Sequence, residues 1–71
     1  MTNLKKLRIK KKMTLMELAI RANVSTSSLF LWEKGKLPTA NKAVQLARVL
    51  DVRASELWPD VQLKRMNIIE D

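Results

Sequence analysis

The side chains able to do chemistry in this sequence are mostly cationic. The 71 residues hold 14 Lys and Arg against 7 Asp and Glu, a formal charge of +7, with no His and no Cys. General acid–base catalysis most often uses His, and His and Cys are the usual transition-metal ligands. The inventory therefore predicts no enzyme, no catalytic residue, no metal site and no cofactor. The positive charge favours a polyanionic partner, nucleic acid first.

The fold that must position these charges is predicted to be all-α. Hydrophobic residues make up 46% of the chain, with one Gly and two Pro, a composition that favours helices over a turn-rich β fold. A chain of this length supports one domain, which must be held by packing because no disulfide is available. Residues 1–58 are predicted to form it, and residues 59–71 a short C-terminal tail.

Apolar spacing and capping residues predict the first two helices. Leu4 and Leu7 lie three residues apart among lysines, as in a one-sided basic helix over residues 3–12. Thr14 followed by Glu17 is a capping box, in which each side chain satisfies a first-turn backbone N–H. The second helix therefore begins there and runs to about residue 22, where Asn23 suits the left-handed conformation that ends a helix.

Three more helices follow by the same reasoning. Ser25 is the expected cap of a third helix that buries Ser28, Leu29 and Trp32 and ends at Gly35. A fourth begins after Thr39, and a short fifth, residues 54–58, stops before the proline at position 59. The tail stays open between packing, pairing as a strand and fraying. The inward side of the fourth helix is predicted to be Ala43, Val44, Leu46, Ala47 and Leu50.

The second and third helices, joined by a three-residue turn, have the spacing of a helix-turn-helix. Their residues closely resemble the phage repressor and Cro family (XRE type). The resemblance covers roughly residues 3–58, which implies a compact five-helix domain. It is carried by Met13-Thr14, Glu17-Leu18-Ala19, Val24-Ser25, Leu29, Trp32-Glu33, Gly35, Pro38-Thr39, Leu46-Ala47, Leu50, Val52 and Glu56-Leu57.

The resemblance implies that Arg8 of the first helix pairs with Glu33 at the end of the third. The physical reasoning agrees, because a Glu beside a Trp on a buried face needs a partner and an Arg offers a bidentate one. This structural ion pair would fix the recognition helix against the first helix.

The family's base-reading positions fall on Thr26, Ser27 and Leu31, with Phe30 beside them. Thr and Ser hydroxyls bond to bases or phosphate, and exposed Leu or Phe makes apolar contact with a thymine methyl. Many relatives have a Gln directly after the capping Thr, where it binds phosphate. This chain has Leu15 at that position, so the contact is missing.

Phosphate contacts are expected at the start of the second helix, at Thr14, and from Lys36 and Lys42, although exposed lysines also serve only as solubilising charges. For the lysines of the first helix we expect a general steering of DNA rather than specific contacts.

These features predict a small sequence-specific transcriptional regulator, Cro-like, in a phage lysis–lysogeny switch, because the chain has no room for the separate domain of larger repressors. Its partners would be double-stranded operator DNA and, as a dimer, a second copy of the chain. Without a signal or membrane span, it is expected in the cytoplasm of a bacterium or of a phage's host. No membrane and no small-molecule ligand are expected.

Two alternatives remain open. Ser27, Phe30 and Leu31 also suit a protein-binding face, as in an antirepressor that binds a cognate repressor. A lesser alternative is the antitoxin of a toxin–antitoxin pair, which uses the same fold.

Overall fold

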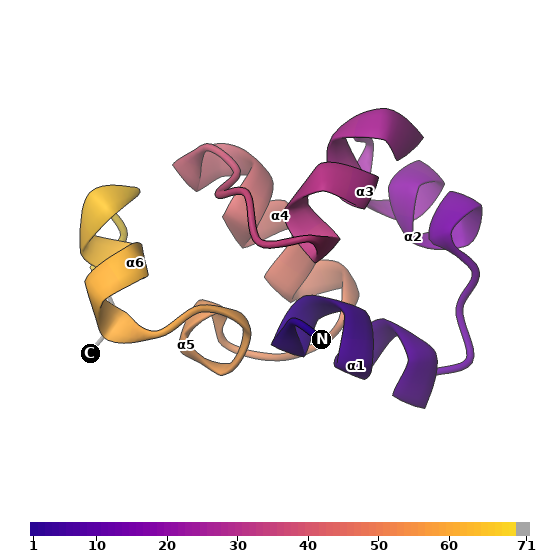
Figure 1. Cartoon of the computed structure of the whole chain (residues 1–71), viewed down its shortest axis with the longest axis horizontal. Coiled ribbons are helices and arrows are strands. Elements are labelled where there is room, and N and C mark those ends of the chain that lie inside the picture. Colours follow the sequence, from indigo (N-terminus) through magenta and orange to yellow (C-terminus); the bar gives the residue numbers. More distant parts are fainter. Residues whose placement is uncertain (70–71) are drawn as a thin grey trace.

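The computed structural model describes residues 1–69, and in those residues it contains six helices and no strand (Figure 1). The prediction of an all-α fold is confirmed. The first five helices correspond to the five predicted ones, and the sixth is an addition. The helices are α1 (Asn3–Lys10), α2 (Leu15–Ala22), α3 (Thr26–Glu33), α4 (Ala40–Val49), α5 (Ala54–Leu57) and α6 (Asp60–Arg65).

Local sequence explains most of the helix boundaries. The Thr2 hydroxyl caps α1, which ends earlier than predicted because Lys12 adopts a left-handed conformation with a φ of 58°. Thr39 precedes α4 in the extended conformation of an N-cap, but its side chain makes no capping hydrogen bond. Gly35, with a φ of 115°, follows Lys34, the C-cap of α3, and a side chain would be strained there. The turns between helices are therefore set by caps and left-handed residues.

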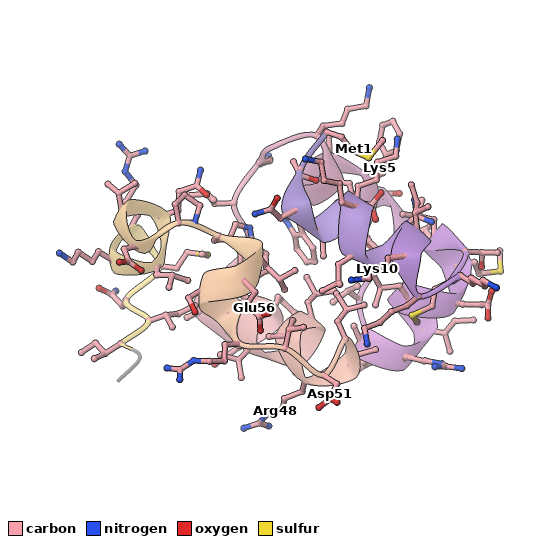
Figure 2. The ribbon with its side chains drawn as sticks, turned by 90° about the horizontal axis from the view of Figure 1, so that it is seen from below. Met1, Lys5, Lys10, Arg48, Asp51 and Glu56 are labelled. Carbon is pink, nitrogen blue, oxygen red and sulfur yellow. The ribbon has the colours of Figure 1, made fainter. Side chains whose placement is uncertain are left out.

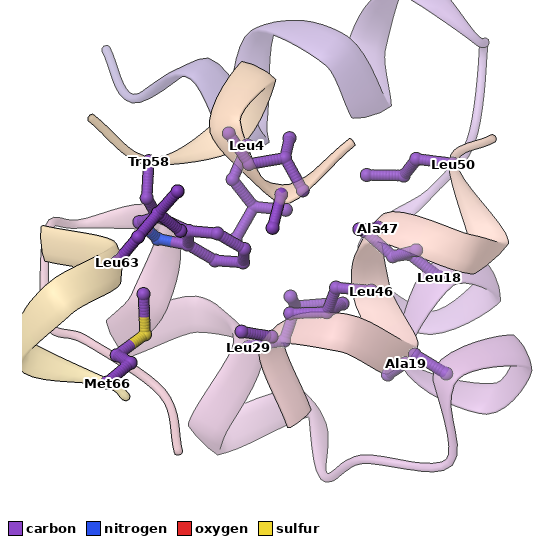
Figure 3. Close-up of a cluster of buried hydrophobic side chains, with 14 of the residues drawn as sticks. Leu4, Leu18, Ala19, Leu29, Leu46, Ala47, Leu50, Trp58, Leu63 and Met66 are labelled. Atoms are coloured by element: carbon purple, nitrogen blue, oxygen red, sulfur yellow. The ribbon is translucent and has the colours of Figure 1, made fainter. Parts of the chain in front are cut away.

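The core is a cluster of leucines and alanines to which every helix contributes (Figure 3). Leu4, Leu18, Leu29, Leu46 and Leu50 are fully buried and come from α1, α2, α3 and the end of α4. Of the predicted inward side of α4, Ala43, Leu46, Ala47 and Leu50 are buried, whereas Val44 is only half-buried. This packing, rather than any covalent link, holds α3 in place.

The predicted tail is mostly helix. Pro59 precedes α6, and Leu63 and Met66 bury against the cluster that includes Trp58 (Figure 3). The Ile68 amide donates to the carbonyl of Leu63 at 2.9 Å, which closes the helix end. Of the open alternatives, packing is therefore the one observed for residues 59–68. Residues 70–71 of the tail lie outside the described residues.

The described helices are all short, and none is long and apolar enough to cross a membrane.

Candidate nucleic-acid interface

A tight turn places α3 across α2. Asn23 adopts the left-handed conformation (φ 56°, ψ 47°), as its place in the sequence predicts, and the Val24 amide donates to the carbonyl of Ala19 at 3.0 Å. Ala19 and Ala22 are almost fully buried, and their small side chains allow α2 and α3 to approach closely. The two helices therefore form one rigid unit with the first turn of α3 at its surface.

The capping box at the start of α2 is formed in both directions. The Glu17 amide donates to Thr14 Oγ1 at 3.0 Å, and the Thr14 amide donates to Glu17 Oε1 at 3.0 Å. The backbone hydrogen bond from Thr14 lowers the pKa of Glu17 below its ordinary value, helped by the Thr14 hydroxyl and by nearby Arg21. Thr14 itself is exposed. Its hydroxyl is thus engaged in the cap while its surroundings remain open to a phosphate.

The first turn of α3 presents polar groups outward. Ser25 Oγ accepts from the Ser28 amide at 3.1 Å and donates to Ser28 Oγ at 2.8 Å, which explains why Ser28 is only half-buried rather than inward as predicted. Thr26 and Ser27 are exposed. Within the described residues, their side chains and backbone amides bond to no other protein group. Four donors or acceptors at a helix N-terminus are therefore available to a ligand.

Phe30 and Leu31 lie on the same exposed side of α3, with 48% and 44% of their surface accessible. Lys34, which caps the C-terminal end of α3, holds its ammonium 4.8 Å from the centroid of the Phe30 ring. This contact is a cation–π interaction. We call Thr26, Ser27, Phe30 and Leu31 together the α3 outer face.

The two lysines predicted to bind phosphate have different surroundings. Lys36 follows the end of α3 and is exposed. Lys42, in the first turn of α4, is half-buried and donates from Nζ to the carbonyl of Asn23 at 3.4 Å. Lys42 therefore lies against the turn between α2 and α3, and only its remaining ammonium protons are open to phosphate.

Arg8 and Glu33 lie in contact beneath this interface. Arg8 Nε donates to Glu33 Oε2 at 2.6 Å and Nη2 to Oε1 at 3.1 Å, while Nη1 donates to the carbonyl of Met13 at 2.9 Å. Both side chains are largely buried. Thr2 Oγ1 also donates to the Glu33 carbonyl at 2.9 Å. The C-terminal end of α3 is thus bound to α1 by three hydrogen bonds.

Three neighbours of the interface were missed by sequence reasoning. Lys34 is joined to Phe30, a contact that its spacing of four residues on one helix would have suggested. Met16 and Ile20, also four residues apart, are 62% and 72% exposed on α2. Six of the eight residues of α2 are apolar, so the sequence does not single out the exposed ones, and only the packed structure shows that Met16 and Ile20 point outward.

Comparison with known proteins agrees with this geometry. Residues 4–57 match the family model described as helix-turn-helix, which covers α1 to α5 and leaves α6 outside. No curated protein matches the chain.

Proposed function

Because the chain belongs to the helix-turn-helix family of the phage repressor and Cro type, a family of DNA-binding regulators, we propose that it is a sequence-specific, Cro-like transcriptional regulator. It places α3 in the major groove of an operator, in the cytoplasm of a bacterium that carries a phage lysis–lysogeny switch. Thr26, Ser27 and Leu31 contact base edges, while Thr14, Lys36 and Lys42 contact phosphates.

One observation carries this proposal. The first turn of α3 is exposed and its polar groups are unused, yet the helix is held at both ends, by the Ser25 cap and by the Arg8–Glu33 ion pair. A preorganised, exposed helix start is what groove recognition requires, because ordering the helix on binding would lower the affinity.

The operator is expected to be palindromic and to bind two copies of the chain, with half-sites about one helical turn apart. Of the apolar residues in and near the tail, Leu57, Trp58 and Leu63 are buried within one copy, whereas Val61 and Ile69 are 62% and 93% exposed. Val61 and Ile69 are therefore the residues that we propose for a two-fold contact. Sedimentation of the protein alone and on DNA measures the stoichiometry, and one copy per operator would contradict it.

The test is a gel-shift titration on DNA from beside the gene, at two salt concentrations and with random competitor. A discrete complex that survives competitor supports the proposal. Replacing Thr26 and Ser27 by alanine should then weaken operator binding and leave competitor binding unchanged. Binding that competitor removes completely contradicts sequence-specific recognition.

A second candidate function is that of an antirepressor that binds a cognate repressor through the α3 outer face. The exposure of Phe30 and Leu31 favours it, because an apolar pair on a short helix is also typical of a protein-binding surface. Truncating a buried aromatic anchor commonly costs about 2 kcal/mol or more of binding energy. If the antirepressor is correct, Phe30→Ala should therefore abolish repressor capture. Capture that survives this substitution contradicts it.

A further inference from the structure

The positive charge of this protein is concentrated at its N-terminal end. Residues 1–16 contain six of the fourteen cations and none of the seven carboxylates, so that residues 17–71 carry eight cations against seven carboxylates. Arg8 is neutralised by Glu33, but no Asp or Glu in the described part of the chain forms an ion pair with the lysines of α1. Nearly the whole net charge therefore belongs to one helix and the turn after it.

Two lysines of α1, Lys6 and Lys10, point away from α3. Residues two apart on an α-helix differ by about 200° around the axis, so that Lys6 and Lys10 lie opposite Arg8, which contacts α3. Lys6 and Lys10 instead line a shallow hollow together with Ser55 and Glu56 of α5.

The positions of α1, α2 and α3 in the molecule agree with the outward direction of Lys6 and Lys10. In Figure 1, α1 runs along the lower edge of the molecule, while α2 and α3 occupy its upper part. Figure 2, seen from below, shows Lys10 on the side where Glu56 also lies. We call Lys6 and Lys10 the α1 basic surface.

General steering of the operator does not account for this placement. A positive surface attracts phosphate to itself, and here that would turn the α3 outer face away from the DNA. A membrane surface fits poorly as well, because an interfacial helix needs an apolar face and Ile9 is the only apolar residue exposed on α1. Exposed lysines at successive turns of a helix suit the phosphate backbone, which they bind as point charges without reading sequence.

We propose that the α1 basic surface binds the phosphate backbone of a second DNA segment while α3 occupies the operator, so that one molecule links two duplexes. The proposal rests on the proposed function, because the operator must hold the other side. Once the protein is bound there, neighbouring DNA is present at a high effective concentration, and even a weak phosphate surface is then occupied.

The experiment measures capture of a labelled duplex that lacks the operator by protein bound to an immobilised operator duplex. The wild type should capture it. Lys6→Gln/Lys10→Gln should reduce capture about tenfold or more and lower its salt dependence by about two units of slope, one for each lost phosphate contact. Operator affinity, measured separately, should change less than about twofold.

A matched control removes the same charge elsewhere. Lys64→Gln/Arg65→Gln neutralises two exposed cations of α6 and should leave capture unchanged. Glu56→Gln should raise capture, since it removes the carboxylate beside Lys6 and Lys10. Equal losses from both double variants would mean that only overall charge matters, and would overturn the proposal.

Two other results also overturn it. The first is operator binding without capture by the wild type. The second is a surface that binds polyglutamate but not the second duplex, which would point to an acidic protein instead. Loss of operator binding by the wild type itself is a separate outcome, because it contradicts the proposed function.

Discussion

The α3 outer face and the α1 basic surface are chemically opposite. The first presents two hydroxyl groups and two apolar side chains, and the second presents lysines alone. Base edges are distinguished by hydrogen bonds and methyl contacts, whereas phosphates are bound by charge without regard to sequence. The two surfaces thus divide specificity and charge between different sides of one small domain.

The side chains of α1 show how this division is built. Arg8 turns inward to Glu33 and holds α3, while Lys6 and Lys10, two residues to either side, turn outward. One basic helix therefore carries both a structural cation and surface cations. Their difference in burial predicts very different consequences of removing them.

The largest effect is expected on removing Arg8. Arg8→Ala leaves Glu33 buried without its partner and should lower the free energy of unfolding by about 3 kcal/mol, measured by urea denaturation. Lys10→Ala, the control on the same helix, should change it by less than about 0.5 kcal/mol. Replacing both partners, as in Arg8→Met/Glu33→Leu, should recover much of the loss. Equal effects of Arg8→Ala and Lys10→Ala would remove the distinction between structural and surface cations.

The next effect concerns the α3 outer face. Leu31→Ala removes an apolar contact with the groove and should weaken operator binding about tenfold, with non-specific binding unchanged. Ile9→Ala, which truncates an apolar residue of similar exposure on α1 (48% against 44%), is the control in the same gel shift. If Leu31→Ala leaves the operator affinity intact, Leu31 does not read bases.

The parts of this structure that sequence predicts are those set by neighbouring residues. Thr14, Glu17, Asn23 and Ser25 cap or end helices within four residues of themselves, so their types and spacing were sufficient. Arg8 and Glu33 lie 25 residues apart and came from a family resemblance together with the need of a buried carboxylate for a partner.

The parts that sequence missed depend on tertiary packing. Helix α6 has six residues and too few apolar positions for a clear period, so its formation depends on the burial of Leu63 and Met66 against the core. The lysines of α1 are visible in the sequence, but the side of the molecule that they occupy follows only from the direction of Arg8. Helical periodicity identifies the polar face of α1, but it does not show on which side of the molecule, relative to α3, that face lies.

A smaller effect compares one lysine from each side of the molecule. Lys36→Gln should weaken operator binding about fivefold at 0.15 M salt and lower the slope of log affinity against log salt by about 0.9, because one phosphate contact is lost. Lys10→Gln removes the same charge from the α1 basic surface and should leave this slope unchanged. Fluorescence anisotropy at four salt concentrations measures both slopes. Equal slopes for the two variants would place α1 on the operator as well.

The smallest effect involves Glu17, the first carboxylate of the chain, which lies where the basic N-terminal segment meets α2. The capping box lowers the pKa of Glu17 in the folded protein below its ordinary value of 4.5. The charged carboxylate therefore adds stability above that value and loses it as the pH falls through the lower folded-state pKa. Glu17→Gln keeps a hydrogen-bond acceptor but lacks the charge, so its melting temperature should lie below that of the wild type from pH 6 to 8. The two melting temperatures should approach each other as the pH falls through the lowered folded-state pKa of Glu17. A difference that persists at low pH would mean that shape or hydrogen bonding, rather than charge, stabilises the start of α2.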